Sequence, residues 1–282
     1  MWTTEQLLAE AVGGRVGERF RGLDEVDALS RDELVTAAGQ VLRRPQAAEF
    51  SPGARPLSRR LLAAQWTVLL EHLRLPEEPV VLELCVGSSD PVVVAVDTLF
   101  GRRGHYHTLN LNRQLAAELM ERCSTLALQV SLIEDDAQNL PQYFDDGTFD
   151  CACFHHAVND ILQTAVATAR GMDTRDIDWW PTERRMIEWL AEEWERHRLQ
   201  EVGLPQLRRI LEVAARAVKP GGFLCFDHWT FEHYLAMDWF PGELFSQLIP
   251  LAREVALSLS VPLVEITPAG LDRQWWMVLR KE

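Results

Sequence analysis

The stretch "VVLELCVGSSDP", from Val80 to Pro91, is an apolar run that breaks into small residues and then reaches an acidic residue and a proline. Its first five residues have the apolar, partly β-branched character of a buried strand. Asp90 and Pro91 are typical of the N-cap and the first residue of a helix. The stretch therefore predicts a strand, a tight turn and a helix, with Gly87 allowing a ligand to approach the backbone of the turn.

After Val80 the chain alternates short β-rich runs with helical patterns. These runs are "VVLEL", "HYHTLNL", "LQVSLIE", "CACFHH", "GFLCFD", "PLVEIT" and "QWWMVL". The first five are separated by stretches long enough for crossover helices, which indicates a parallel sheet covered on both faces. The last two are joined by "PAGLD", which is short enough for an antiparallel hairpin. We therefore predict an α/β fold with a doubly wound, mostly parallel, seven-stranded sheet.

Helices are expected before the first strand and after the fourth. "TTEQ" and "SRDE" have the form of capping boxes, and "LSRRLLAAQWTVLLEHL" is amphipathic and ends just before a proline. After the fourth strand, Met186, Leu190 and Trp194 fall on one face of a further helix. We predict an N-terminal helical segment at residues 1–75, an α/β domain at 76–282 and a helical insertion at about 161–203.

The composition limits the class of protein. The chain has 282 residues, 47% of them hydrophobic, and a formal net charge of −14, so it can bury a large core but has no basic surface for nucleic acid. No apolar run is long enough to span a membrane, and "MWTTEQLLAE" lacks the features of a secretory signal. We expect a cytoplasmic protein with no nucleic-acid or membrane partner. The five cysteines lack the paired spacing of zinc ligands, so no metal site is expected.

Several segments together resemble the motifs of one enzyme family. "EDDAQNLPQYFDDGTFDCACFHHAVND" and "AVKPGGFLCFD" occur in the order and at roughly the spacing found in class I S-adenosylmethionine-dependent methyltransferases, and "VVLELCVGSSDP" is similar to the first motif of that family. "LVEIT" and "QWWMVLR" resemble the hairpin that distinguishes the family's sheet from dinucleotide-binding sheets. The resemblance covers residues 80–282, and it implies S-adenosylmethionine as cofactor and S-adenosylhomocysteine as product.

The resemblance also implies which residues hold the cofactor. Glu83 would accept a hydrogen bond from the cofactor's amino group, directly or through water, and Gly87 would lie against the methionine and ribose portion. Cys85, where the family usually has glycine, belongs to the same turn. Asp136 would accept from the adenine amino group, and the backbone N–H of Ala137 would meet a ring nitrogen.

The second strand departs from the family pattern. The acidic residue that usually accepts from both ribose hydroxyls is replaced by Asn110, with Asn112 nearby, and we predict that both asparagines belong to the cofactor site. An amide has one acceptor oxygen and no charge, so it cannot reproduce that pair of charge-assisted bonds. Asn110→Asp is therefore expected to tighten cofactor binding.

"FHHAVND" supplies the candidate residues for chemistry on the acceptor. His155 and His156 end the fourth strand, which the resemblance places beside the methyl sulfonium, so His155 is also a predicted cofactor contact. Methyl transfer needs an aligned and sometimes deprotonated nucleophile, and histidine suits both tasks. We predict His155, or less favourably His156, as the group that takes the proton, oriented with help from Asn159 and Asp160. His228 is the reserve base. The alternative for a histidine here is a bond to the cofactor's carboxylate or a helix cap.

These features favour an enzyme that transfers a methyl group to an oxygen or nitrogen of a small molecule or a modified peptide, in bacterial secondary metabolism. One alternative is the same fold catalysing a cyclisation or decarboxylation, which Asn110 keeps open. Another is a non-catalytic partner subunit, which the retained Glu83, Gly87 and Asp136 argue against. The expected partners are the acceptor and, as the assembly to test, a second copy in a homodimer. The N-terminal helices and the insertion are predicted to form a lid over the acceptor pocket.

Overall fold

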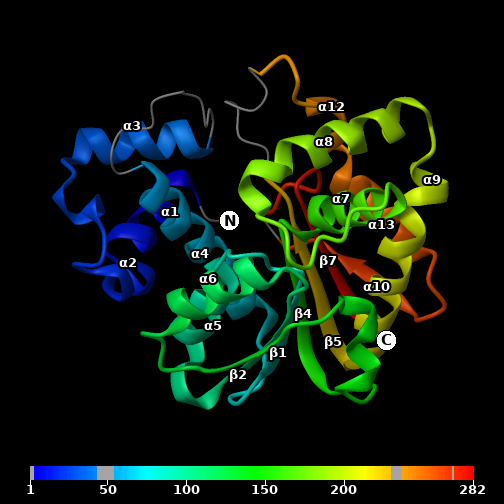
Figure 1. The fold of residues 1–282 in the computed structure, drawn as a ribbon. Coiled ribbons are helices and arrows are strands. Elements are labelled where there is room, and N and C mark those ends of the chain that lie inside the picture. The colour runs from blue at the N-terminus through cyan, green and yellow to red at the C-terminus, as the bar shows by residue number, and fades with distance from the viewer. Residues whose placement is uncertain (1–2, 43–53, 230–236, 269) are drawn as a thin grey trace.

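Seven strands form one sheet in the computed structural model, which describes residues 3–42, 54–229, 237–268 and 270–282. The strand order is β3-β2-β1-β4-β5-β7-β6; β1 to β5 are parallel, and β7 runs antiparallel between β5 and β6 (Figure 1). The predicted sheet with its terminal antiparallel pair is thus confirmed. The strands are β1 (Val80–Leu84), β2 (His105–Leu109), β3 (Gln129–Ile133), β4 (Phe149–His155), β5 (Val218–Asp227), β6 (Leu263–Ile266) and β7 (Trp276–Lys281).

Helices cover both faces of the sheet and make two hydrophobic cores. Along β1, Leu82 and Leu84 pack toward α7, α10 and α13, whereas Val81 packs toward α4, α5 and α6. Glu83 has the same parity as Val81 and so points to the second of these faces. The helices named here are α4 (Ala54–Leu73), α5 (Pro91–Phe100), α6 (Arg113–Cys123), α7 (Ala157–Ala169), α10 (Leu204–Ala217) and α13 (Leu248–Leu257), with the short α12 (Gly242–Ser246) preceding α13.

The strand order reverses between β1 and β4, because the chain runs outward through β2 and β3 before it crosses to β4. Two short 3-10 helices lie in the connections: η2 (Gly101–Arg103) precedes β2, and η3 (Ala137–Gln142) follows β3. In open parallel sheets, ligands bind beyond the carboxyl ends of the strands at such a reversal. A ligand is therefore expected at the turns that follow β1, β2, β3 and β4.

Before the sheet, the chain forms a small helical layer that rests on α4 (Figure 1). Both predicted capping boxes are present, at Thr3 with Gln6 and at Ser30 with Glu33. One face of α4 packs against the earlier helices, and its other face, which carries Trp66, packs against α5 and the sheet. The earlier elements are α1 (Thr4–Val12), α2 (Arg15–Phe20), η1 (Glu25–Ala28) and α3 (Arg31–Leu42).

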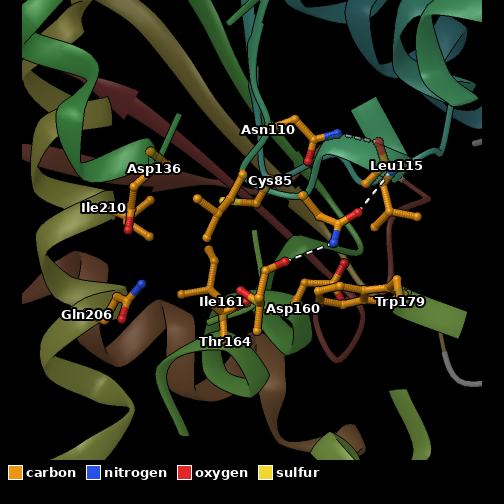
Figure 2. A pocket seen from close by; sticks show the side chains of 15 residues that line it. Cys85, Asn110, Leu115, Asp136, Asp160, Ile161, Thr164, Trp179, Gln206 and Ile210 are labelled. Carbon is orange, nitrogen blue, oxygen red and sulfur yellow. Dashed lines mark hydrogen bonds between the residues drawn. The ribbon is translucent and has the colours of Figure 1, made fainter. Parts of the chain in front are cut away.

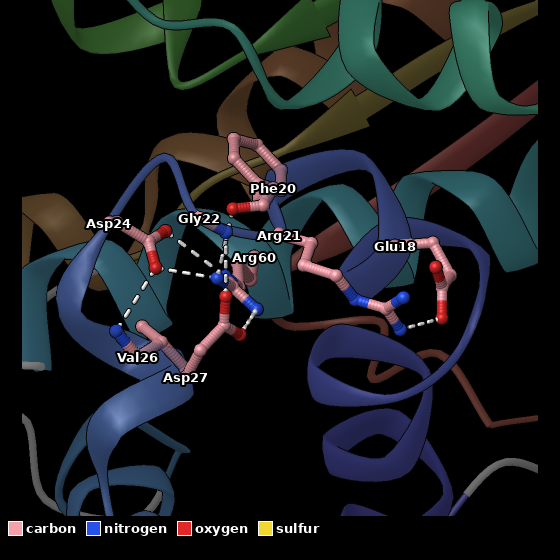
Figure 3. A network of polar contacts seen from close by, with 8 residues as sticks. All are labelled: Glu18, Phe20, Arg21, Gly22, Asp24, Val26, Asp27 and Arg60. Carbon is pink, nitrogen blue, oxygen red and sulfur yellow. Dashed lines mark hydrogen bonds and ion pairs between the residues drawn. The ribbon is translucent and has the colours of Figure 1, made fainter.

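A buried arginine fixes this helical layer to α4 (Figure 3). The Arg60 side chain is fully buried; its Nε donates to Asp24 Oδ2 at 3.0 Å and its Nη1 to Asp27 Oδ1 at 3.1 Å. Its Nη2 also donates to the carbonyl oxygen of Phe20 at 3.3 Å. A buried guanidinium is tolerated when its donors are satisfied in this way, so the contact specifies where η1 lies on α4.

The insertion between β4 and β5 contains α8 (Trp179–Glu195) and α9 (Leu199–Val202). Met186 and Leu190 are buried and Trp194 packs against the core, as the predicted face of this helix requires. Arg170, at the end of α7, ties the insertion down by donating to Glu192 at 2.8 Å and to Glu193 at 2.7 Å. Within the described ranges, no helix combines the length and the apolar character needed to cross a membrane.

Candidate functional site

A cavity lies at the carboxyl ends of β1, β2 and β3 (Figure 2). The turns after these three strands form one wall, and α6, α7, α8 and α10 supply the rest. It therefore occupies the reversal in strand order where a ligand is expected. The lining residues are Cys85, Gly87, Asn110, Leu111, Asn112, Leu115, Asp136, Ala137, Asp160, Ile161, Thr164, Thr174, Trp179, Gln206 and Ile210.

The turn after β1 exposes its backbone to the cavity. Cys85 and Gly87 both have positive φ angles, 56° and 59°, which favour glycine and cost another residue about 1 kcal/mol. The family's usual glycine at position 85 follows from this conformation. A Cβ atom on Gly87 would lie 3.6 Å from Leu115 Cδ1 and 3.9 Å from Asp160 Oδ2, so a bulky side chain there would occupy the cavity.

Asn110 performs a task that a carboxylate cannot. Its side chain is buried, and its Nδ2 donates to the carbonyl oxygen of Gly87 at 2.6 Å. This bond fixes the amide orientation, because the opposite orientation would face two oxygens against each other. The remaining acceptor, Oδ1, is available to a ligand. Aspartate has no hydrogen to donate to Gly87, so this bond argues against the expectation that Asn110→Asp tightens cofactor binding.

Asn112 lines the cavity, but both ends of its side-chain amide bond to the protein backbone. Its Oδ1 accepts from the backbone N–H of Leu115 at 3.0 Å, which caps α6. Its Nδ2 donates to the carbonyl oxygens of Thr174 at 2.8 Å and Ile177 at 3.1 Å. Asn112 therefore anchors the loop that leads into α8 and positions Trp179 at the cavity.

Asp136 and Ala137 follow β3 and face the same cavity, as the sequence predicts. Asp136 is the N-cap of η3, where its Oδ1 accepts from the backbone N–H of Gln138 at 3.0 Å and its Oδ2 from the Gln138 amide at 2.9 Å. These bonds hold the carboxylate at the cavity edge. A carboxylate oxygen has more than one acceptor direction, so Asp136 can still accept from a ligand amine.

Two predicted residues lie elsewhere: in the described part of the chain, the cavity wall includes neither Glu83 nor His155. Glu83 is fully buried on the α4 side of the sheet and accepts a hydrogen bond from the Tyr106 hydroxyl. Burial raises the pKa of the Glu83 carboxyl well above its usual range, despite that hydrogen bond, and the nearby Asp227 and Asp90 raise it further. In this geometry, Glu83 does not directly contact a ligand in the cavity.

Asp90 also differs from the expected role. Pro91 is the first residue of α5 as predicted, but the Asp90 side chain makes no N-cap hydrogen bond. Its carboxylate instead pairs with Arg59 of α4, whose Nε lies 2.8 Å from both carboxylate oxygens. The charged partner takes precedence over the cap because a bidentate ion pair is the stronger interaction in this buried position.

His155 is paired with Asp227 beside α4. Its Nδ1 lies 2.8 Å and 2.9 Å from the two Asp227 oxygens, and the Trp66 indole nitrogen is 3.2 Å from the same Nδ1. A proton on Nδ1 donated to Asp227 leaves the lone pair of the imidazole on Nε2. The Trp66 indole can only donate, so it and Asp227 compete for Nδ1; the tautomer that a general base needs is the one in which Nδ1 donates to Asp227.

His156 and His228 extend this group into a row of three rings. The ring centroids are 5.0 Å apart between His155 and His156, and 4.8 Å apart between His156 and His228. His156 Nε2 accepts from the backbone N–H of Trp229 at 3.0 Å, so its lone pair is occupied. In the described part of the chain, neither ring nitrogen of His228 has a hydrogen-bond partner. Burial lowers the pKa of His156 to about 3, helped by His155, and that of His228 well below its usual value.

Several cavity residues were not assigned to a cofactor site from the sequence. Asp160 and Thr164 are four residues apart on α7, and Gln206 and Ile210 are four apart on α10, which places each pair on one helix face. That spacing is the only signal the sequence carries for them. Which helix faces meet at the cavity depends on packing between elements, which helical spacing does not specify.

No protein-family model matches the chain, and no curated protein sequence matches it. Among solved structures, a SAM-dependent methyltransferase from Aquifex aeolicus is 14% identical, with a TM-score of 0.46 over 79% of this chain and 91% of that one. The CurJ carbon methyltransferase is 12% identical, with a TM-score of 0.47 over 99% and 66%. Fibrillarin from Aeropyrum pernix, with natively bound S-adenosyl-L-methionine, is 14% identical, with a TM-score of 0.38 over 76% and 72%.

These similarities are too low to carry an activity from those proteins to this one. The strand order provides the assignment instead, since a parallel sheet β3-β2-β1-β4-β5 followed by an antiparallel β7 inserted before β6 differs from the all-parallel dinucleotide-binding sheet. The chain therefore has the Rossmann-like fold of the class I S-adenosylmethionine-dependent methyltransferases.

Proposed function

We propose that the chain is an S-adenosylmethionine-dependent methyltransferase whose cofactor binds in the cavity after β1, β2 and β3. One observation carries the proposal: the turns after these strands bring Gly87, Asn110 and Asp136 into a single cavity. An open backbone, an amide oxygen and a carboxylate, in this order along the sheet edge, suit the methionine, ribose and adenine portions of the cofactor. The bound cofactor supplies a methyl group on a sulfonium, which is reactive toward a nucleophile.

The acceptor is proposed to be an oxygen or nitrogen of a small molecule or a modified peptide, with bacterial secondary metabolism in the cytoplasm as the setting. The chain's own task is then to align that nucleophile and, for a hydroxyl, to remove its proton. His155, which lies outside the cavity wall, is the proposed base because a proton on Nδ1 donated to Asp227 would leave Nε2 to accept. His156 is less suited, since its Nε2 already accepts from Trp229.

The proposal is tested first by calorimetric titration with S-adenosylmethionine and S-adenosylhomocysteine. Wild type should bind both saturably, and Gly87→Leu should abolish binding because the new side chain fills the cavity. Gly147→Leu is the matched control: Gly147 also has a positive φ, 72°, and open space around it, but it lies before β4 at the opposite edge of the sheet. If wild type binds neither compound at millimolar concentration, the proposal fails.

A methyl-release assay with candidate acceptors then separates a methyltransferase from its alternatives. Saturable binding without methyl transfer to any acceptor class would favour a different reaction on this fold or a non-catalytic role. The base assignment is tested by the pH–rate profile of His155→Gln beside His156→Gln. Loss of His155 should lower turnover by about 100-fold or more and remove the acidic limb, with cofactor affinity retained. Near-normal turnover in His155→Gln would exclude it as the base.

A further inference from the structure

The charge of the cavity wall is one-sided. Two carboxylates, Asp136 and Asp160, line the cavity, and among the described lining residues there is no lysine, arginine or histidine. The whole chain carries a formal charge of −14, so the net charge has the same sign as the wall. A concave site with acidic groups and little water favours a ligand with positive charge at the same place.

Among the described residues, only one oxygen of Asp160 has a hydrogen-bond partner, which leaves the other to meet such a charge. It lies in the first turn of α7, and its Oδ1 accepts from the Asn159 amide at 2.6 Å. Its Oδ2 is the atom that lies 3.9 Å from the Cβ position of Gly87, across the cavity from the turn after β1. Figure 2 shows the carboxylate between Ile161 and Trp179, pointing into the cavity. The free oxygen therefore faces the portion of a ligand that passes Gly87.

The insertion carries a second carboxylate one helical turn beyond the cavity wall. Glu183 of α8 is half-buried, four residues after Trp179, which forms part of the cavity wall. Burial raises the pKa of the Asp160 carboxyl, and the charge of Glu183 raises it further. Two carboxylates in a poorly solvated region repel each other when ionised, and a cation between them relieves that repulsion.

We propose that Asp160 recognises the positive charge of the cofactor's sulfonium, with Glu183 strengthening the negative field from α8. This assignment rests on the proposed function, in which the methionine portion passes Gly87. Asp136 follows β3, on the far side of Asn110, and Glu83 lies outside the cavity. Asp160 is therefore the carboxylate that remains beside the methyl donor.

The proposal predicts discrimination between the cofactor and its product. S-adenosylmethionine and S-adenosylhomocysteine share the adenosine, the amino group and the carboxylate, and they differ in the charged sulfonium against a neutral thioether. A carboxylate that contacts the sulfonium favours S-adenosylmethionine over S-adenosylhomocysteine. A carboxylate that held the amino group would favour both equally.

The test is calorimetric titration of both compounds into wild type, Asp160→Asn and Glu183→Gln. Asp160→Asn keeps the size of the side chain and an oxygen for Asn159, but removes the charge. It should weaken S-adenosylmethionine binding about tenfold or more, the scale of a lost charged interaction, and change S-adenosylhomocysteine binding by less than about threefold. Glu183→Gln should show the same selectivity with a smaller loss. Glu195→Gln, on the exposed end of α8, removes one charge outside the cavity and should leave both affinities unchanged.

The outcomes separate the two proposals. If wild type binds neither compound, the proposed function fails and this inference fails with it. If wild type binds both and Asp160→Asn weakens them equally, Asp160 contacts the amino group or serves structure, and the sulfonium assignment is overturned. Unchanged affinity for both compounds overturns it as well. Melting temperatures of the variants, measured without ligand, show whether a loss of affinity comes from loss of the fold.

Discussion

Asn110 shows how a single hydrogen bond changes what a substitution should do. Its Nδ2 donates to the carbonyl oxygen of Gly87 at 2.6 Å. Asn110→Asp would replace this donor with a carboxylate oxygen, which repels the carbonyl oxygen. We expect cofactor affinity to fall about tenfold, which corresponds to about 1.4 kcal/mol, the scale of one unsatisfied buried polar group. Calorimetry with S-adenosylhomocysteine measures the change. Asn110→Ala, which loses the donor without adding a charge, should lose less; tighter binding by the aspartate variant would contradict this account.

Glu83 should make the fold less stable as the pH rises. Its pKa in the folded protein is raised by burial, so the protein holds a proton there that the unfolded chain has already released above about pH 4.3. Its contribution to stability is therefore complete below that pH and is lost as the pH rises through the raised pKa. Glu83→Gln keeps an acceptor for Tyr106 and cannot ionise.

The melting temperatures of wild type and Glu83→Gln should coincide near pH 4 and diverge toward pH 8, with the variant more stable. The free-energy difference should grow by up to about 1.4 kcal/mol per pH unit. Glu78→Gln, at an exposed position just before β1, should follow wild type at every pH. A variant that is less stable than wild type at pH 8 would mean that the Glu83 carboxylate is stabilised in its charged form.

At the scale of elements, α8 is the part of the insertion that should respond to the cofactor. Trp179 lines the cavity, whereas its neighbour Trp180 is 53% exposed. Trp179→Ala should weaken cofactor binding about tenfold or more through lost contact area, and Trp180→Ala should not. Hydrogen exchange of residues 173–190 should slow in wild type when S-adenosylhomocysteine is added. Equal effects of the two substitutions would argue that α8 only packs on the domain.

The Arg60 contact should control the helices before α4 without disturbing the sheet. Arg60→Met removes a buried guanidinium and leaves Asp24 and Asp27 without their partner, although both carboxylates retain some access to water. We expect a loss of about 2 kcal/mol in unfolding free energy and faster hydrogen exchange confined to residues 4–42. Arg55→Met, at an exposed position on the same helix, is the control. Faster exchange throughout the sheet would show that the two layers unfold as one unit.

The elements themselves were largely predictable, because each strand is an apolar run and each predicted cap uses residues close in sequence. Gly87 was predictable for the same reason, because it follows directly from its strand, whereas Asp136 and Ala137 were predicted from the resemblance to the methyltransferase motifs. Asp90 was not, since the partner that draws its carboxylate away from the helix is Arg59, 31 residues earlier in the chain. The side on which Glu83 lies follows from the alternation along β1, but which side holds the cavity depends on the packing of α7, α8 and α10.

At the scale of the whole molecule, two buried histidines should set the acid limit of stability. The pKa of His156 is lowered to about 3 and that of His228 is also lowered, so the folded protein takes up fewer protons than the unfolded chain below about pH 6.5. Their contribution is complete above that pH and is lost as the pH falls toward the lowered values. His228→Phe should fit beside Phe245, whose ring lies 5.5 Å from that of His228, and cannot be protonated.

Urea denaturation at pH 7 and pH 5 measures this difference. The stability of His228→Phe relative to wild type should rise on going to pH 5, by up to about 1.4 kcal/mol per pH unit below 6.5. His72→Gln, at an exposed position, should leave the pH dependence unchanged. Parallel stability curves for His228→Phe and wild type would mean that His228 is not responsible for the acid sensitivity.

The position of α4 between two cores determines where this chain can be joined to a segment of another protein. Trp66 packs with Trp276 of β7, at a centroid distance of 5.2 Å, so α4 completes the sheet domain although it precedes β1 in sequence. The exchangeable module is then the group of helices before α4, held on by Arg60, rather than everything before residue 75. A chimaera joined between residues 43 and 53 should inherit the sheet intact and a new outer layer, whereas one joined at residue 75 would carry a foreign helix against Trp276 and His155.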